Sequence, residues 1–319
     1  MAAPTNTLTG VTPNVGQRED LEDAIYRVAP EDTLFTSNIG KVKATAIAHE
    51  WQTESLATPD ATNAQLEGDD VGTLDAPNLT LRLKDVCQIF RKTGGVSDTQ
   101  EVVNLAGRAN EMARQKVLKG IELRRDVEAR FIGNFASVEE SGATTRKSAG
   151  AQAWITSNDS RGAGGSDGGF SAGIVAAATN GTQRAFTEVQ VKAVMATAFS
   201  NGGKPSQAYM SGTHKQLFSA FTGIADIRSD VSGKSQATIY GAADVYVSDF
   251  KAITLIPVPY GMTRACLLIE PDMWAVGTLR GIESKTLAKQ GDNERFLMTC
   301  EKTLVCKNER ASAIVADLT

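Results

Sequence analysis

Residues 51–78 read WQTESLATPDATNAQLEGDDVGTLDAPN, a polar stretch with few large apolar residues. Period-two segments of strand character flank it, Lys41–Glu50 before and Leu79–Phe90 after. So long a structureless connection is unusual inside a compact domain. We therefore predict a projecting hairpin, each arm reaching about 50 to 60 Å at roughly 3.3 Å per residue.

Downstream of this hairpin, the pattern predicts one long helix. Asp98-Thr-Gln-Glu101 has the form of a capping box, and the helix should run to about Phe131, end near Gly133 and measure about 50 Å. Its apolar positions are Val102, Leu105, Ala106, Ala109, Met112, Ala113, Val117, Ile121, Val127 and Phe131. Upstream, residues 1–17 should form an extended arm, and a short helix should begin near Arg18 and stop before Pro30.

The second half of the chain predicts a mixed domain followed by strands. Ser141–Gly181 is rich in Gly, Ala, Ser and Thr, which indicates flexible loop around a short strand near Trp154. The predicted helices are 186–199 and 213–221, and the predicted strands are 245–247, 253–256 and a succession from about 265 to 318. These elements indicate an α+β fold.

Composition excludes several classes of protein. The chain has 319 residues with 41% apolar residues, no apolar run near the roughly 18 residues of a membrane helix, and no signal peptide, so synthesis in the cytoplasm is expected. Its four cysteines form no C-x-x-C pair and should be reduced and packed, with a disulfide between Cys300 and Cys306 less favoured. Net charge is −4 without a basic block, which argues against sequence-specific nucleic-acid binding.

The residues of enzyme sites are scarce, so we predict no catalytic, cofactor-binding or metal-binding residues. His49 and His214 are the only histidines, and the adjacent pairs Glu139-Glu140 and Asp69-Asp70 point their carboxylates apart. Ser232-Gly-Lys-Ser235 lacks the earlier glycine of a phosphate-binding loop, and the glycine run 162–169 does not fit G-x-G-x-x-G. An enzyme with a glycine-rich active-site loop is the least favoured alternative.

Several strings resemble those of the major capsid proteins of tailed bacteriophages, which have the Hong Kong 97-type fold. They are Arg18-Glu-Asp-Leu-Glu-Asp-Ala-Ile25, Pro30-Glu-Asp-Thr33, Glu50-Trp51 with Leu56, Glu67-Gly-Asp-Asp70, Val96-Ser-Asp-Thr99, Glu122-Leu-Arg-Arg-Asp-Val-Glu128 and Leu287-Ala-Lys-Gln-Gly-Asp292. The resemblance covers nearly the whole chain. It implies an N-terminal arm and short helix (1–43), an E-loop hairpin (44–85), a P-domain (86–150 and 270–319, spine helix about 98–132) and an A-domain (151–269).

The resemblance also implies a function. The protein would assemble with itself, as hexamers and pentamers, into an icosahedral or prolate head that encloses double-stranded DNA through non-specific contact. Further partners would be a portal, a separate scaffolding protein, because only a short arm precedes the first helix, and decoration proteins as an option. The protein would be made in the host cytoplasm, mature from a procapsid and reside in the virion, with no membrane contact. The alternative is the shell of a cellular nanocompartment, which holds protein cargo instead of DNA.

Charge suggests where copies meet. Residues 44–85 carry eight acidic and two basic residues, a local charge of −6. They contain no lysine in 51–78, so Lys–Asn crosslinking from that segment is not expected. The predicted helix offers basic partners, and we expect the loop to dock over a neighbour's helix or the adjoining strands, the alternative being a solvated loop. The inter-subunit contact candidates are Trp51, Leu56, Glu67, Asp69, Asp70, Arg114, Arg124 and Arg125. Trp51 and Leu56 should be buried only by neighbours.

Overall fold

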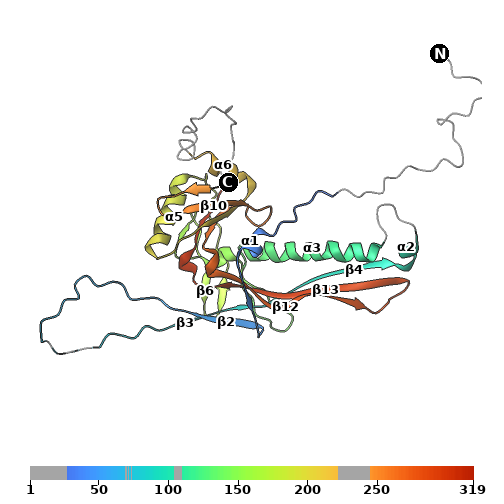
Figure 1. The fold of residues 1–319 in the computed structure, drawn as a ribbon, viewed down its shortest axis with the longest axis horizontal. Coiled ribbons are helices and arrows are strands. Elements are labelled where there is room, and N and C mark those ends of the chain that lie inside the picture. The colour runs from blue at the N-terminus through green and yellow to red at the C-terminus, as the bar shows by residue number, and fades with distance from the viewer. Residues whose placement is uncertain (1–26, 69, 71, 73, 104–109, 222–244) are drawn as a thin grey trace, which may run out of the picture.

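The computed structural model describes residues 27–68, 70, 72, 74–103, 110–221 and 245–319. The body is elongated, with a four-stranded sheet and its covering helix on one side, a six-stranded sheet on the other, and a hairpin that projects far beyond both (Figure 1). The predicted α+β class is confirmed.

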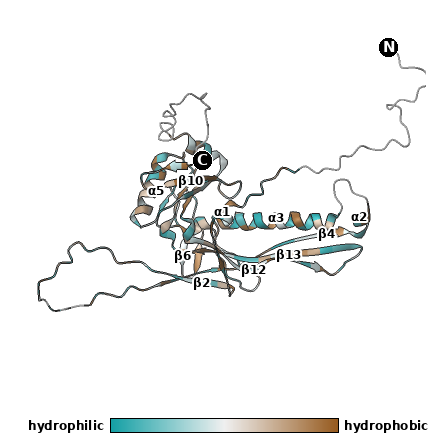
Figure 2. Cartoon of the chain, viewed as in Figure 1, coloured by the Kyte–Doolittle hydropathy of each residue, from teal (hydrophilic) through white to brown (hydrophobic). Residues whose placement is uncertain are grey.

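The four-stranded sheet has the order β1-β12-β13-β4, in which β1 is parallel to β12 and the other neighbours are antiparallel. Its strands are β1 (Gly40–Lys43), β12 (Trp274–Leu287), β13 (Asn293–Cys306) and β4 (Gln88–Ser97). Helix α3 (Glu111–Ile132) lies along this sheet and carries both polar and apolar residues, as a helix with one buried face requires (Figure 2). Leu123, Val127 and Phe131 are buried in the core of the sheet and α3.

The six-stranded sheet has the order β5-β14-β11-β8-β10-β9 and a second apolar core. Its strands are β5 (Asp159–Ser160), β14 (Ala313–Ala316), β11 (Ala265–Ile269), β8 (Gln207–Met210), β10 (Ala252–Pro257) and β9 (Val245–Val247). Strands β11 and β14 are buried at every residue, which fits their central positions. Helices α5 (Glu188–Ser200) and α6 (Gly212–Ser219) pack against this sheet, confirming the two helices predicted here.

The predicted long helix is shorter than expected. Helix α2 (Asp98–Val102) is capped by Ser97 rather than Asp98, and α3 begins only after Asn110, whose side chain accepts the N–H of Ala113. Val103 and Asn110 have extended backbone, so the helix is not continuous from 98 to 132. The 22 residues of α3 span about 33 Å at 1.5 Å per residue instead of about 50 Å.

Smaller elements correct two further predictions. Trp154 ends a short helix, α4 (Ala151–Trp154), where a strand was predicted. Most of the helix predicted to begin at Arg18 lies outside the described residues; the described helix of this region is α1 (Leu34–Asn38), which the prediction missed. The remaining elements are β6 (Gly169–Ser171), β7 (Ile174–Ala176) and the 3-10 helices η2 (Pro271–Met273) and η3 (Glu309–Ala311).

Helix α1 is held by both halves of the body. The carboxylate of Glu128 on α3 accepts the N–H groups of Phe35 (2.6 Å) and Thr36 (2.8 Å), and the Phe35 ring lies edge-on to Tyr209 and Trp274. The four cysteines are buried free thiols, as predicted. Within the described ranges, no helix is long and apolar enough to span a membrane.

Candidate inter-subunit surfaces

The projecting hairpin begins as two regular strands. Strand β2 (Ala48–Thr53) pairs with β3 (Leu81–Val86) antiparallel, and Trp51 faces Leu83 across the pair. The indole N–H of Trp51 donates to the carbonyl of Cys306 (2.7 Å), and its ring lies 5.6 Å from that of Trp154. Trp51 therefore packs inside its own subunit, and the prediction that only a neighbour could bury it is wrong. An aromatic ring at the foot of the hairpin reaches the domain, whereas one at the tip would not.

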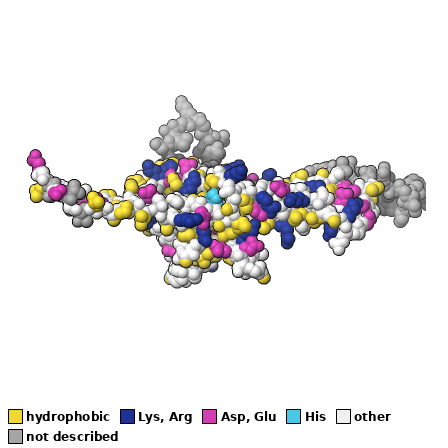
Figure 3. Space-filling model, turned by 90° about the horizontal axis from the view of Figure 1, so that it is seen from below, with side chains coloured by type: hydrophobic (Ala, Val, Ile, Leu, Met, Phe, Trp, Pro, Cys, Tyr) yellow, Lys and Arg dark blue, Asp and Glu magenta, His cyan; other side chains and the backbone are white. Residues whose placement is uncertain are grey.

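Beyond Thr53 and before Leu81 the chain is an open loop that leaves the body (Figure 1). Leu56 lies on this loop and is 88% exposed, and Glu67 and Asp70 are exposed as well, whereas Asp69 lies outside the described residues. Residues 54–80 contain six acids and no Lys or Arg, which Figure 3 shows as magenta and yellow without blue along the projection. Its other exposed leucines are Leu66, Leu74 and Leu79.

The charges at the foot of the hairpin are paired within the subunit. Glu50 forms an ion pair with Arg82, and Lys84 Nζ lies 2.6 Å from the carboxylate of Glu139. Asp85 is completely buried and does not belong to the acidic surface. The charge of −6 predicted for 44–85 therefore belongs to residues 54–80, where six acids have no basic neighbour in sequence.

Asp85 is hydrogen-bonded to two distant parts of the chain. Its carboxylate accepts the hydroxyl protons of Ser148 (2.6 Å) and Thr303 (2.8 Å) and the N–H of Ala149 (3.1 Å). Burial raises the pKa of Asp85 to about 6, although these hydrogen bonds act in the opposite direction. The sequence showed an acid in a strand and no sign of its burial, because the donors come from distant segments.

Most basic residues predicted to receive the loop are engaged within the subunit. Arg114 pairs with Glu111 (3.0 Å), and the Arg125 guanidinium lies 5.8 Å from the centre of the Tyr260 ring. Arg124 differs, because no acidic residue in the described part of the chain forms an ion pair with it. Of the three candidate arginines, the structure leaves this one best placed to receive an outside carboxylate.

Arg124 lies where two adjoining hollows meet between α3 and β12. The hollows measure about 310 Å³ and about 610 Å³, and both are lined by Arg124 and Ile282. The first is lined by Thr33, Thr36, Ser37, Lys41, Arg124, Val127, Val276, Thr278, Ile282 and Lys302, and the second by Lys116, Val117, Gly120, Ile121, Arg124, Ile282 and Met298. We call the two together the α3–β12 groove. Four bases and no acid contribute to it among the residues described.

Sequence reasoning missed half of the basic residues of this groove. Lys41 and Lys302 were not predicted as contacts, because they come from β1 and β13, far from α3 in sequence. Lys302 stands between the polar residues Glu301 and Thr303, so the local sequence gave no signal that its side chain shares a surface with Lys41. Only the tertiary fold shows that this surface adjoins Arg124.

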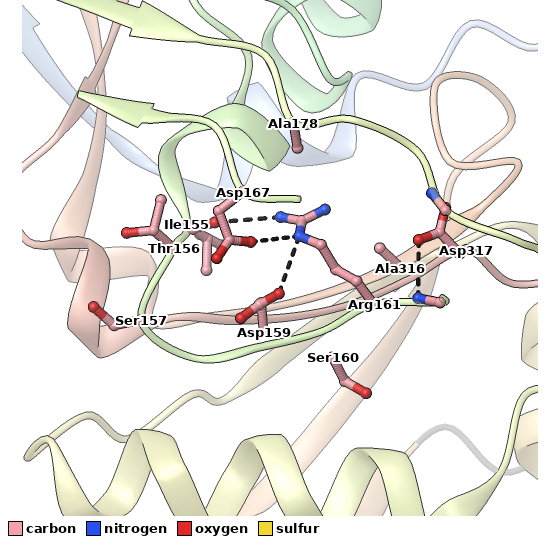
Figure 4. Close-up of polar contacts among 12 residues, drawn as sticks. Ile155, Thr156, Ser157, Asp159, Ser160, Arg161, Asp167, Ala178, Ala316 and Asp317 are labelled. Carbon is pink, nitrogen blue, oxygen red and sulfur yellow. Dashed lines mark hydrogen bonds and ion pairs between the residues drawn. The ribbon is translucent and has the colours of Figure 1, made fainter. Parts of the chain in front are cut away.

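The glycine-rich segment 162–169 is tied down rather than flexible. Arg161 lies between Asp159 (3.0 Å) and Asp167 (2.5 Å), and the buried Asp317 accepts the N–H of Gly162 (3.0 Å), as Figure 4 shows. Burial, reinforced by the nearby Asp167 carboxylate, raises the pKa of Asp159 to about 6. These groups form ion pairs and hydrogen bonds with one another and with the backbone, and these interactions join the segment to the six-stranded sheet.

The two histidines are separated in the structure. His214 is buried, with Nε2 3.2 Å from the carbonyl oxygen of Thr319 and its ring against Phe186. The His49 ring lies 5.8 Å from that of Trp51, tilted by 36°, at the foot of the hairpin. In the described part of the chain, no group of three or more His, Cys, Asp or Glu residues is placed to hold a metal ion.

Comparison with known proteins agrees with this architecture. The family model described as SU10 major capsid protein matches residues 3–319. The major capsid protein of Escherichia phage Phieco32 is 23% identical over 338 residues, covering 94% of each chain. Among solved structures, the capsid asymmetric unit of cyanophage A-1(L) superposes with a TM-score of 0.68 at 12% identity, covering 98% of this chain and 100% of that one. The SrpI encapsulin of Synechococcus elongatus PCC 7942 superposes less closely, with a TM-score of 0.52 at 11% identity over 92% of each chain. The fold is therefore that of phage capsid shells, as predicted, and the chain belongs to the SU10 major capsid protein family.

Proposed function

We propose that this major capsid protein builds the phage head by inserting the loop 54–80 of each copy into the α3–β12 groove of another. The observation that carries the proposal is the loop itself, which combines six acids with four exposed leucines and lies beyond the reach of its own core. Exposed apolar groups in such number mark an interaction surface. A second copy of the chain supplies the surface that matches it.

The groove complements the loop in both charge and polarity. Lys116 and Arg124 stand beside apolar residues, of which Val117 is 63% exposed. Burying one leucine stabilises by about 2 kcal/mol, whereas an exposed ion pair contributes about 0 to 1 kcal/mol. The leucines therefore supply most of the affinity, and the charges guide register and rate.

Other predictions complete the proposal. The hairpin would be the E-loop (44–85), the α3 sheet the P-domain (86–150 and 270–319), and the six-stranded sheet part of the A-domain (151–269). Copies would form hexamers and pentamers around double-stranded DNA, with a scaffolding protein, a portal and optional decoration proteins as partners. Support comes from family membership and from the two separate cores of the body.

Deleting Ser55–Thr73 tests the proposal. The deletion leaves eight residues between β2 and β3, enough to close the hairpin, so the subunit should fold with an unchanged far-ultraviolet circular dichroism spectrum. Closed shells should be absent in electron micrographs. Replacing the same segment by a Gly/Ser linker of equal length serves as the control for length, and it should fail as well. Normal shells from either variant would contradict the proposal.

The nanocompartment shell is the second candidate, because the SrpI encapsulin shares the fold. The two functions differ in cargo. Particles filled with DNA absorb more strongly at 260 nm than at 280 nm, whereas shells filled with protein do not. We expect the DNA ratio from purified particles, and a protein ratio with a co-purifying enzyme would favour the nanocompartment.

A further inference from the structure

Two hydrogen bonds join the hairpin to β13 or the residues next to it, in addition to the Lys84–Glu139 ion pair and the contact of Trp51 with Trp154. Trp51 donates its indole N–H to the carbonyl of Cys306, and Asp85 accepts the hydroxyl of Thr303. Because Trp51 pairs with Leu83 and Asp85 with His49, the two points are two residue pairs apart along the hairpin, about 7 Å. Two separate attachment points fix the direction of the extended hairpin, whereas a single point would let it rotate.

The loop turns small movements at these attachment points into large ones at its tip. Residues 54–80 reach about 40 Å beyond the paired strands when both arms are extended. The ratio of 40 Å to 7 Å means that a shift of about 1 Å at one attachment point moves the tip by about 6 Å. A displacement of about 6 Å would move the loop residues out of contact with the side chains that line the groove.

Asp85 is an unusual choice for an attachment point, because its charge is fully buried and forms no ion pair with a described Lys or Arg. Buried carboxylates without a cation are costly and are retained mainly where they have a task. Neutral Asn or Ser would hold a hairpin at lower cost. A carboxylate instead accepts several hydrogen bonds at once, and its bonds are shorter and stronger than neutral ones.

We propose that Asp85 is a positioning residue whose negative charge, held by Ser148, Ala149 and Thr303, sets the direction in which the loop leaves the subunit. Loss of that charge weakens one of the two attachment points and lets the tip depart from the docking direction. The inference rests on the proposed docking of the loop into a neighbour's groove. To the docking proposal it adds the residue that sets the direction of the loop before a neighbour binds.

Protonation shows how the charge acts. A protonated Asp85 must donate its new hydrogen, yet both hydroxyls beside it already donate to it, and Ser148 Oγ also accepts the N–H of Leu304 (3.2 Å). One hydroxyl must therefore rotate so that it accepts the carboxyl proton and donates its own hydrogen elsewhere, which changes the geometry around the carboxyl. Because burial raises the pKa of Asp85 to about 6, this change falls in mildly acidic solution.

Other titratable groups border Asp85 and must be separated from it. His49 is its cross-strand neighbour, and burial lowers the pKa of His49, so it is neutral at pH 7. Cys87 on β4 has its pKa raised to about 11 by burial, and Arg130 on α3 stays charged, so neither titrates between pH 5 and 8. Arg146 and Glu301 shift the pKa of Cys87 in opposite directions and form an ion pair with each other (3.3 Å).

The test measures the direction of the loop relative to the body in an unassembled subunit. Spin labels on cysteines introduced at Leu66 in the loop and Val189 on α5, both exposed, report the tip-to-body distance by double electron–electron resonance. The four native cysteines are buried, and labelled chains are diluted with unlabelled ones at a protein concentration at which light scattering detects no assembly. We expect a narrow distance distribution at pH 8 that broadens and shifts by several ångströms as pH falls through about 6.

Four variants identify the group that causes the transition. Asp85→Asn should show the broad distribution at every pH, whereas His49→Gln should keep the transition. Thr303→Val removes one donor to the carboxylate and should move the midpoint to higher pH, which a merely structural role would not do. Glu128→Gln, the matched change at a buried carboxylate far from the hairpin, should leave the transition in place.

Two outcomes would overturn the inference: a wild-type distribution in Asp85→Asn, or a midpoint that ignores Thr303→Val. Failure of the docking proposal looks different, because the distance is measured without a neighbour. If the loop did not dock at all, Asp85→Asn would still broaden the distribution but would leave the assembly rate unchanged. If both proposals hold, assembly of this variant at pH 8 should slow about tenfold, corresponding to about 1.4 kcal/mol.

Discussion

The two ends of one hairpin show opposite chemistry. At its foot every charge has a partner in the same subunit, Trp51 packs on Trp154, and Asp85 is fully hydrogen-bonded. At its tip, leucines and acids face outward together. Secondary-structure propensity does not explain this contrast between foot and tip, since both lie in one short stretch of chain. The difference lies in the binding partner: the residues of the foot pack within their own subunit, whereas those of the tip are proposed to pack against another subunit.

The largest expected effect comes from Trp51→Ala at the foot. Truncating this half-buried ring removes its contact with Trp154 and the hydrogen bond to Cys306, and it should lower the free energy of unfolding by about 3 kcal/mol. Urea denaturation of the unassembled subunit measures this. The matched change at the tip, Leu56→Ala, should leave that free energy within about 0.5 kcal/mol and slow assembly instead. Equal destabilisation by both changes would remove the contrast between the two ends.

Burial of Asp85 should make the folded subunit as a whole more stable in acid, which is a separate quantity from the direction of the loop. Its pKa rises from 3.8 unfolded to about 6 folded, so the folded state favours the protonated form by about 3 kcal/mol. This contribution is fully present below pH 3.8 and is lost as pH rises through about 6. The difference between wild type and Asp85→Asn in unfolding free energy should therefore change between pH 4 and pH 7. A constant difference would show that Asp85 does not titrate in this range.

Charge reversal at the tip should have a smaller effect. Glu67→Lys with Asp75→Lys should slow assembly severalfold, and Arg124→Glu should partly restore it by recreating an attractive pair in the groove. Raising salt should weaken both effects, because the screening length is about 8 Å at physiological ionic strength. Lys285→Glu, an exposed base on β12 outside the groove, is the control and should not restore assembly. Light scattering that shows no response to these changes or to salt would argue against electrostatic guidance.

The smallest effect is expected for Lys84→Ala. The pair with Glu139 is partly exposed, so its loss should change the free energy of unfolding by less than about 1 kcal/mol. Assembly should be unaffected, because Lys84 belongs to the foot. A large assembly defect would show that the interface extends down the hairpin beyond Thr53.

Sequence reasoning reached the features that are local and missed those that depend on distant segments. The loop was predictable because residues 54–80 lack both apolar periodicity and basic residues, and strands such as β9 follow from their own alternation. The break before α3 was missed because capping by Asn110 competes with an apolar period that continues through it. The α3–β12 groove was missed because Lys41, Arg124 and Lys302 meet only after the sheet forms.

The order of strands has a consequence for the timing of folding. Strand β1 at residues 40–43 pairs with β12, and β4 pairs with β13, so both strands need partners that are synthesised more than 190 residues later. Leu304 and Cys306 belong to the first core, and Val315 and Leu318 to the second. A chain interrupted before these residues lacks part of both cores, so its groove cannot form while its loop is already present. Such a fragment could insert its loop into the groove of a complete subunit, but it has no groove to accept another loop. It would therefore stop the growth of a shell at the edge where it binds.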